Sequence, residues 1–264
     1  MSQPRTCLLL AALVLTACEG PDDSTAPSTG TARIRVVNVS ATVSSLDATR
    51  LGGSLASALA FGAVSPATGY GSSPAGPGDL TVRNGAVTIY NAQAPLRRDS
   101  ATTILMIGST DAAFAAGSAR TFQPIALRDT VAVPASGAWL RIVHAADSVA
   151  VSTVTAGLAT SGVDIYVYPQ GTTRPAAAPL AGSALRLINA TYRTVTAYQP
   201  LTNAGAYQVE VFVTGAAPAT ATPLISTVAT LAAGSKTTVV ARRPLVGATT
   251  APLNTFGLVL LAEQ

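Results

Sequence analysis

The chain has 264 residues, of which 48% are hydrophobic, 5% aromatic and 11% charged, and its formal net charge is +4. Such an apolar chain with so few charges is not intrinsically disordered, and its scattered basic residues argue against the concentrated patch of a nucleic-acid binder. The length suffices for one or two domains with a buried core. We therefore expect a folded protein that does not bind nucleic acid.

Residues 1–17 are predicted to form a bacterial lipoprotein signal peptide. Arg5 supplies the positive n-region, and Leu8–Leu15 is an apolar segment of secretory length, shorter than the roughly 20 residues that cross a bilayer as a helix. The segment ends in Leu15-Thr16-Ala17-Cys18, which resembles the lipobox, where cleavage precedes the cysteine and its thiol takes a diacylglyceryl group. Cys18 is therefore the predicted lipid attachment site. The alternative is an ordinary signal peptide followed by an incidental cysteine.

A lipid anchor at Cys18 would place the protein in the cell envelope, outside the cytoplasm. Each buried methylene of an acyl chain contributes about 0.8 kcal/mol, so two or three chains hold a protein on a membrane. Resemblance to bacterial lipoproteins implies the outer membrane, if the cell has one, because Glu19 follows the cysteine. Cys7 would leave with the signal peptide, so no free thiol is expected for a disulfide, a metal or a nucleophile. Residues 18–31 are predicted to be the lipidated cysteine and a flexible tether.

Three sequence segments recur in the same order along the chain. Ala32–Val39 returns as Ala138–Ala145, Ser100–Leu105 as Ser235–Val240, and Phe122–Asp129 as Phe256–Glu263. Three ordered recurrences indicate an internal duplication. We therefore predict two domains, over residues 32–130 and 138–264, joined by a linker at 131–137 that contains Pro134 and Gly137.

Within each half, the apolar residues recur with a period of two, which predicts β-strands. Val163–Tyr168 and Tyr207–Val211 alternate in this way, and Ile104–Ile107 is predicted to be a strand buried on both faces. Asn84-Gly85 predicts a hairpin with a type I′ turn, whereas Ser54–Phe61 has the pattern of a short helical turn. The predicted fold class is all-β, with two tandem antiparallel β-sandwich domains that are immunoglobulin-like or transthyretin-like.

Strand motifs of the second half resemble a known bacterial family. The motifs are Arg141–Ala145, Val163–Val167, Ala204–Val211 and the Ala-Gly turn of Leu231–Ser235, and they are similar to those of the bacterial domain of unknown function 4397. The resemblance covers most of residues 138–264 and is weaker over 32–130, where Asn38 replaces the histidine. It implies an extracytoplasmic β-sandwich, often lipid-anchored or associated with the cell wall, and it supplies no catalytic residues.

The sequence contains one histidine and no convincing serine nucleophile. His144 shares its strand parity with Leu140 and Ile142, which predicts a buried, hydrogen-bonded structural residue. Asn38 at the equivalent position supports this interpretation, because an amide can bind the same backbone groups but cannot act as a base. Gly52–Ala56 is the nearest approach to a Gly-x-Ser-x-Gly elbow. It lacks the final glycine and the α/β context, so we predict a loop.

The acidic residues of the two predicted domains are scattered, which gives no clear pair for acid–base catalysis. They are Asp47, Asp79, Asp99, Asp111, Asp129, Asp147, Asp164, Glu210 and Glu263. Asp129 and Glu263 recur at equivalent strand ends, which suggests a structural cap, while Asp147 and Asp164 could approach each other and bind a cation. We assign no catalytic residue, no metal site and no cofactor.

Aromatic residues of the second half could form a sugar-binding platform on one sheet. They are Trp139, Tyr166, Tyr168, Tyr192 and Tyr198. The alternative is packing between strands or between domains. The doublets Arg97-Arg98 and Arg242-Arg243 are predicted to lie in solvated turns, with binding of an anionic polymer as the alternative.

These patterns together predict a non-catalytic, membrane-anchored envelope module that contacts an envelope protein or polysaccharide. One alternative is a carbohydrate-binding module, which requires exposed and coplanar tyrosines. The other is a hydrolase of envelope polymers with a site near the domain junction, which requires a convergent pair of acidic groups.

Overall fold

The computed structural model describes residues 30–111, 120–129, 132, 135–146, 162–175, 184–216 and 220–263 of the chain. These residues form 17 strands and no helix, which confirms the predicted all-β class. The predicted signal peptide, Cys18 and part of the predicted linker lie outside the described residues. Within the described ranges, no helix has the length and apolar character needed to cross a membrane.

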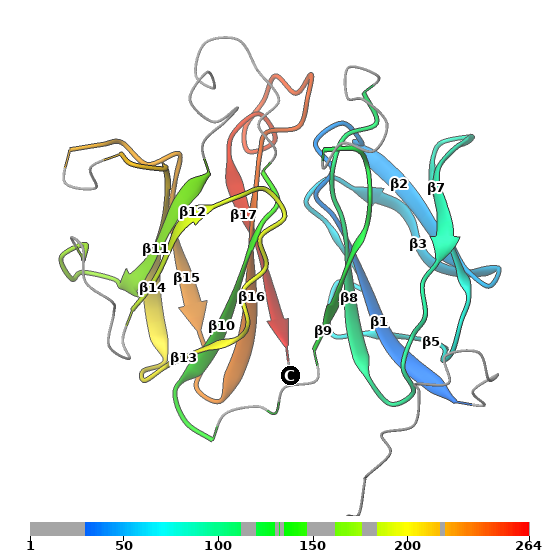
Figure 1. The fold of residues 1–264 in the computed structure, drawn as a ribbon, viewed down its shortest axis with the longest axis horizontal. Helices are drawn as coiled ribbons and strands as arrows, with labels where there is room; N and C mark the ends of the chain where they lie inside the picture. Colours follow the sequence, from blue (N-terminus) through cyan, green and yellow to red (C-terminus); the bar gives the residue numbers. More distant parts are fainter. Residues whose placement is uncertain are drawn as a thin grey trace, which may run out of the picture.

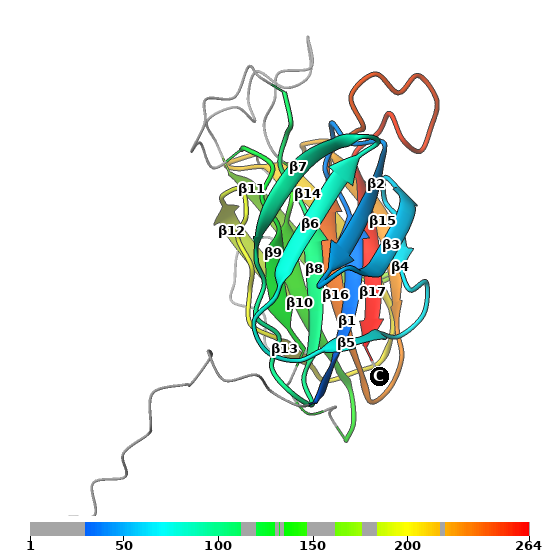
Figure 2. The same cartoon turned by 90° about the vertical axis from the view of Figure 1, so that its right-hand side faces the viewer.

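The strands form four sheets stacked as layers (Figure 1). The first inner sheet has the order β4-β1-β8-β9, with β5 also paired to β1: β4 Val64–Ser65, β1 Thr31–Asn38, β8 Ala101–Met106, β9 Ile125–Arg128 and β5 Gly71–Pro74. The first outer sheet has the order β3-β2-β6-β7: β3 Gly53–Ala60, β2 Ser45–Arg50, β6 Asp79–Asn84 and β7 Val87–Gln93. Figure 2 shows this outer sheet lying across the inner one.

The second half repeats this arrangement. Its inner sheet has the order β13-β10-β16-β17: β13 Gln199–Leu201, β10 Ala138–His144, β16 Ser235–Arg242 and β17 Gly257–Glu263. Its outer sheet has the order β12-β11-β14-β15: β12 Leu185–Ala190, β11 Val163–Pro169, β14 Gly205–Val213 and β15 Ile225–Leu231. Each half is therefore a sandwich of two facing sheets.

Both inner sheets contain one parallel pair, β1 with β8 and β10 with β16, while every other described strand pair is antiparallel. Parallel neighbours need a crossover connection. In each half, the chain leaves the first inner strand and builds two strands of the outer sheet. It then returns to the inner sheet for one or two short strands, adds two more outer strands, and comes back beside the first inner strand. The sandwiches are thus antiparallel except at this central pair.

The inner sheets are buried on both faces. One face of each packs against its own outer sheet, and a separate cluster joins the two inner sheets across the junction. This junction core contains Val37, Val39, Leu105, Ile107 and Leu127 from the first half, and Val143, Ala145, Val240, Val259 and Leu261 from the second. The prediction that Ile104–Ile107 is buried on both faces is confirmed.

Two local predictions differ from the structure. The hairpin of β6 and β7 forms, but Asn84 pairs with Val87 and the turn is Gly85-Ala86, one residue later than predicted. Gly85 has a φ of 58° at the first turn position, as a type II′ turn requires. Ser54–Phe61, which was expected to form a short helical turn, lies almost entirely in β3. A bulge there adds one residue between Ala56 and Leu59, so these buried residues share a face at a helix-like spacing of three.

Candidate functional site

Four buried charged side chains between the two inner sheets form ion pairs with one another. Arg35 of β1 and Arg141 of β10 occupy equivalent positions in the two halves, and they meet Asp129 and Glu263 at the ends of β9 and β17. None of the four residues is more than 5% exposed. We call this group the junction cluster. Buried charges are stable only when they are paired and hydrogen-bonded, so each bond of the cluster matters.

Each arginine of the cluster binds the last inner strand of the other half. Arg35 donates to Glu263 Oε1 at 3.2 Å and to the backbone oxygen of Ala262 at 3.0 Å. Arg141 donates to Asp129 and, at 3.1 Å, to the backbone oxygen of Arg128. The two sets of contacts are related by an approximate twofold exchange of the halves, because equivalent residues make equivalent bonds.

Threonines of the central parallel pair complete the cluster. Arg35 Nε donates to Thr103 Oγ1 at 2.9 Å, and Arg141 Nε donates to Thr238 Oγ1 at 3.0 Å. The Thr103 hydroxyl donates to Asp129 at 2.6 Å, and the Thr238 hydroxyl makes the matching bond in the other half at 2.8 Å. The threonines therefore hold each carboxylate beside the arginine of their own half.

A tyrosine covers the cluster on each side. The Tyr70 hydroxyl donates to Asp129 Oδ2 at 2.8 Å, and the Tyr198 hydroxyl donates to Glu263. Each ring lies against the arginine of its own half, at 4.7 Å for Tyr70 and 4.5 Å for Tyr198. Burial raises the pKa of both phenols, so both remain hydrogen-bond donors near neutral pH. Both carboxylates are thus engaged by arginines and hydroxyls.

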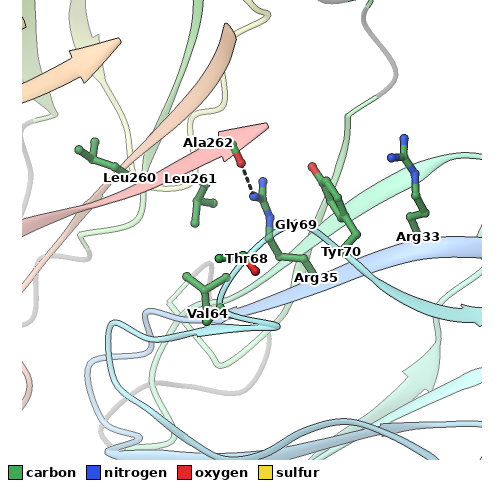
Figure 3. Close-up of a pocket in the computed structure, with 10 residues that line it drawn as sticks. Arg33, Arg35, Val64, Thr68, Gly69, Tyr70, Leu260, Leu261 and Ala262 are labelled. Atoms are coloured by element: carbon green, nitrogen blue, oxygen red, sulfur yellow. Dashed lines mark hydrogen bonds between the residues drawn. The ribbon is translucent and has the colours of Figure 1, made fainter. Parts of the chain in front are cut away.

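A pocket of about 460 Å³ opens beside the cluster (Figure 3). The first half contributes Arg33, Arg35, Val64 and residues 67–70, and the second contributes Leu260–Ala262 of β17. Figure 3 shows the Arg35 and Tyr70 side chains pointing from the first half toward β17. The pocket therefore exists only where the two halves meet.

Arg33 gives this pocket a positive charge. Its side chain is exposed, and its guanidinium carbon lies 5.5 Å from the centroid of the Tyr70 ring. Among the described residues, no carboxylate forms an ion pair with Arg33. A guanidinium beside an aromatic ring suits a ligand that combines a carboxylate or another planar anion with an apolar part.

His144 is buried, as predicted, and does not line this pocket. Its ring packs edge-on against Tyr192 with centroids 6.4 Å apart, and burial lowers its pKa to about 4. The predicted side-chain hydrogen bond is not seen at Nδ1, which has no partner among the described residues. The equivalent Asn38 does bind backbone, because its Nδ2 donates to the oxygens of Val43 and Leu59 at 3.0 and 3.1 Å.

Asp47 and Asp164 hold equivalent bulges in the two halves. Asp47 accepts from the backbone N–H of Ala58, and Asp164 from that of Asn189, both at 2.8 Å. Ala58 and Asn189 have positive φ angles of 46° and 51°, so the carboxylates stabilise a strained backbone. Asp164 therefore has a structural role, and its predicted cation partner Asp147 lies outside the described residues.

The other predicted acidic residues do not converge with the cluster. Glu210 accepts from Arg174 at 2.8 Å and from the Tyr168 hydroxyl at 2.9 Å on the second outer sheet. The exposed carboxylates are Asp79, Asp99 and Asp111. Within the described ranges, no three histidine, cysteine, aspartate or glutamate side chains are grouped so that they could hold a metal ion.

The predicted aromatic platform does not form an exposed row. Tyr166 and Tyr168 are buried, and Tyr166 packs edge-on against Phe212 at 5.6 Å. Tyr198 belongs to the junction cluster and Tyr192 packs on His144. These tyrosine rings therefore pack between strands and between the two halves, as the alternative interpretation predicted.

The two arginine doublets differ. Arg97 and Arg98 are exposed, as predicted. Arg242 and Arg243 are buried, so the prediction of a solvated turn is wrong for them. The guanidinium of Arg242 lies 4.7 Å from the Phe61 ring centroid of the first half. The partner half covers this end of β16, and burial lowers the pKa of Arg242.

Sequence reasoning singled out Asp129 and Glu263 but missed Arg33, Arg35 and Tyr70. A signal for Arg35 was present, because Arg35 and Arg141 are both the fourth residue of the first recurring segment. A charge repeated at a position between buried residues indicates a partner across an interface. Arg33 has no such signal, since its equivalent is a tryptophan, Trp139. Tyr70 does recur as Tyr198, because each tyrosine directly precedes the short strand that pairs with β1 or β10, but this equivalence became visible only in the strand registers.

Comparison with protein families gives a match over part of the chain. The model of a family described as Domain of unknown function (DUF4397) matches residues 32–154. No curated protein matches the chain. The match spans the first half and β10 of the second, whereas the resemblance seen in the sequence was stronger over residues 138–264. The chain therefore contains, over residues 32–154, a segment similar to a family to which no function is assigned.

Proposed function

We propose that this protein is a lipid-anchored, non-catalytic binding module of the bacterial cell envelope. Lipidated Cys18 holds it on the extracytoplasmic side of a membrane, the outer membrane if the cell has one. Two copies of the same sandwich domain follow the tether at residues 18–31. Their joined inner sheets bind an envelope protein or glycan without chemical conversion. The lipobox-like sequence supports the anchor, and the equal strand order of the halves supports the duplication.

The observation that carries the binding role is the junction pocket with Arg33. The carboxylates beside it cannot act as a free acid and base, because Asp129 and Glu263 already accept bonds from arginines and hydroxyls. Glycosidic hydrolysis needs two available carboxyl groups. The exposed guanidinium of Arg33, in contrast, is available to a ligand. Bonded carboxylates beside an exposed guanidinium support a binding role over a hydrolytic one.

The anchor is tested by replacing Cys18 with serine in cells. We expect the variant to incorporate no labelled fatty acid and to move from the detergent phase to the aqueous phase in a phase-partitioning assay. Cys7→Ser is the matched control, since that residue precedes the cleavage site, and it should behave as the unaltered protein. Unchanged lipid labelling of Cys18→Ser would contradict the anchor.

The binding role is tested by site-specific photo-crosslinking in cells. A photoreactive amino acid at Thr68, an exposed residue of the pocket wall, should give a discrete adduct with an envelope component. The same amino acid at Val87, which is 64% exposed in the β6–β7 hairpin, should give none. Absence of an adduct at Thr68, or an adduct at Val87 alone, would contradict binding at the junction.

A further inference from the structure

We propose that the free edge of β17 is a docking site for an extended peptide segment of a partner protein. The segment adds to the second inner sheet as a new strand and places an acidic side chain at Arg33. This inference deepens the proposed binding function and rests on it. It identifies the ligand as a protein and names the atoms that bind it.

Hydrogen-bond parity shows which backbone groups of β17 are available. β17 is the last strand in the order β13-β10-β16-β17. The N–H of Ala145 donates to the oxygen of Ala241 at 2.9 Å. The backbone N–H and C=O groups of odd-numbered residues in β16 therefore point toward β10, and those of even-numbered residues point toward β17. Val240 is therefore bonded to its partner Val259. Because successive residues of a strand direct their backbone groups to opposite sides, three residues of β17 face the free edge: Leu258, Leu260 and Ala262.

One end of this edge is already occupied, and the remainder is available. The backbone oxygen of Ala262 accepts from Arg35 at 3.0 Å, as the parity requires. No described residue pairs with Leu258 or Leu260 on that side. Leu260 is also 43% exposed, so this edge carries a large apolar side chain that is open to solvent. An unpaired edge of this kind is a template for the addition of a strand.

The space beside the edge has room for an added strand. The junction pocket lies on one side of β17, and a second pocket of about 360 Å³, lined by residues 224–227, Phe256–Leu258 and Leu260, lies on the other. Leu260 lines both pockets. Successive side chains of an extended peptide point to opposite faces, so they would enter the two pockets alternately.

The two pockets differ in chemistry, which defines the peptide. The junction pocket presents Arg33 and Tyr70, whereas the second pocket presents Leu224, Ile225 and Phe256. A carboxylate on the junction side would pair with the guanidinium of Arg33, which has no acidic partner among the described residues. The fitting segment therefore alternates acidic and apolar side chains.

The first half provides a matched control edge. β9 is the last strand of the first inner sheet, and Arg141 binds its Arg128 oxygen as Arg35 binds Ala262 on β17. Ala126 of β9 is equivalent to Leu260 in the recurring segment, and it is also exposed. Proline at either position removes an edge N–H without removing a bond of the ladder. Because the pocket that contains Arg33 lies along β17, we expect only the proline in β17 to weaken peptide binding.

The experiment selects a phage-displayed library of random nine-residue peptides on the full chain carrying Cys18→Ser in detergent. We expect selected peptides that alternate acidic and apolar residues. Binding of a synthetic selected peptide, measured by fluorescence anisotropy, should weaken about tenfold or more in Leu260→Pro and in Arg33→Glu. Ala126→Pro and Arg83→Glu, an exposed arginine of β6, should bind within about twofold of the unaltered protein.

Amide hydrogen exchange provides a measurement that needs no substitution. In the unaltered edge, the amides of Leu258 and Leu260 should exchange about tenfold more slowly when the selected peptide is bound, because they become hydrogen-bonded. This result supports the proposal even if Leu260→Pro does not fold. Unchanged exchange at both amides with peptide bound would overturn the docking site.

The outcomes separate this inference from the proposed function. Peptides that bind Leu260→Pro and Arg33→Glu as tightly as the unaltered protein would overturn the β17 site but leave a binding module. Binding of glycans in place of any peptide would overturn the inference in the same way. If neither peptides nor glycans bind, and no crosslink forms at Thr68, the proposed function itself would be overturned.

Discussion

Replacing Glu263 with leucine tests whether the junction cluster holds the two halves together. Glu263 is 1% exposed and accepts from Arg35 at 3.2 Å, from Arg141 at 3.1 Å and from Thr238 at 2.8 Å. Its loss leaves two buried guanidinium groups to share Asp129, which lies 4.0 Å from Arg35. Removing one member of a buried ion pair costs about 3–5 kcal/mol. Because Asp129 remains nearby, we expect a loss of about 3 kcal/mol.

A second substitution shows whether the lost stability comes from the pairing of charges. Arg35→Met combined with Glu263→Leu removes one charge of each sign and leaves the Arg141–Asp129 pair. We expect the double variant to be less destabilised than the sum of the single variants by about 1–3 kcal/mol. The coupling would join residues 228 positions apart in the chain, one from each half.

The assay is urea unfolding of the full chain with Cys18→Ser in detergent, followed by fluorescence of the one tryptophan, Trp139, and by circular dichroism. Arg98→Ala is the control, because its 3.2 Å pair with Asp99 is exposed and should contribute less than about 1 kcal/mol. If Glu263→Leu costs no more than this control, or if the two single effects simply add, the junction cluster does not hold the halves together.

Two further predictions concern buried groups away from the cluster. Arg50 is fully buried and donates to the backbone oxygens of Ala94, Pro74 and Gly76. Arg50→Met leaves the oxygens of Ala94 and Pro74 without this donor, while Gly76 keeps its bond from the N–H of Leu96 at 3.0 Å. The substitution should cost about 3 kcal/mol in urea unfolding, and a loss below about 1 kcal/mol would contradict this role. His144 is neutral in the fold down to about pH 4 but takes a proton near pH 6.5 when unfolded, so the unfolded state binds more protons in that window. Stability should fall by about 3 kcal/mol as pH falls through it; His144→Asn should remove this extra loss, and equal pH profiles for both proteins would refute it.

The repeated cluster explains why a tandem pair can act as one body. In each half, the last inner strand ends at a carboxylate, Asp129 or Glu263. The first inner strand carries an arginine, Arg35 or Arg141, at the fourth position of the recurring segment. Exchange of these partners across the junction satisfies all four charges at once. A single half would leave its own arginine and carboxylate on an open apolar sheet face. We therefore expect the junction to be essential for the stability of both sandwiches.

Local patterns in the sequence determined the fold class and many strands. Val163–Tyr168 and Tyr207–Val211 alternate with a period of two and lie in β11 and β14, because a strand directs successive side chains to opposite faces. The parity of His144 correctly predicted its burial. These properties depend on neighbours within a few residues, so the sequence alone contains them.

Only the tertiary structure decided which charges meet and where the junction pocket lies. The burial of Arg242 depends on Phe61 of the other half, and the pocket depends on residues 67–70 lying beside β17. Glu263, which pairs with Arg35 across the junction, lies 228 residues later in the chain. Such contacts form when two sheets, each already specified locally, pack their apolar faces together. The apolar pattern of its strands determines which face each half buries. The docking of one half on the other determines which atoms come together at that face.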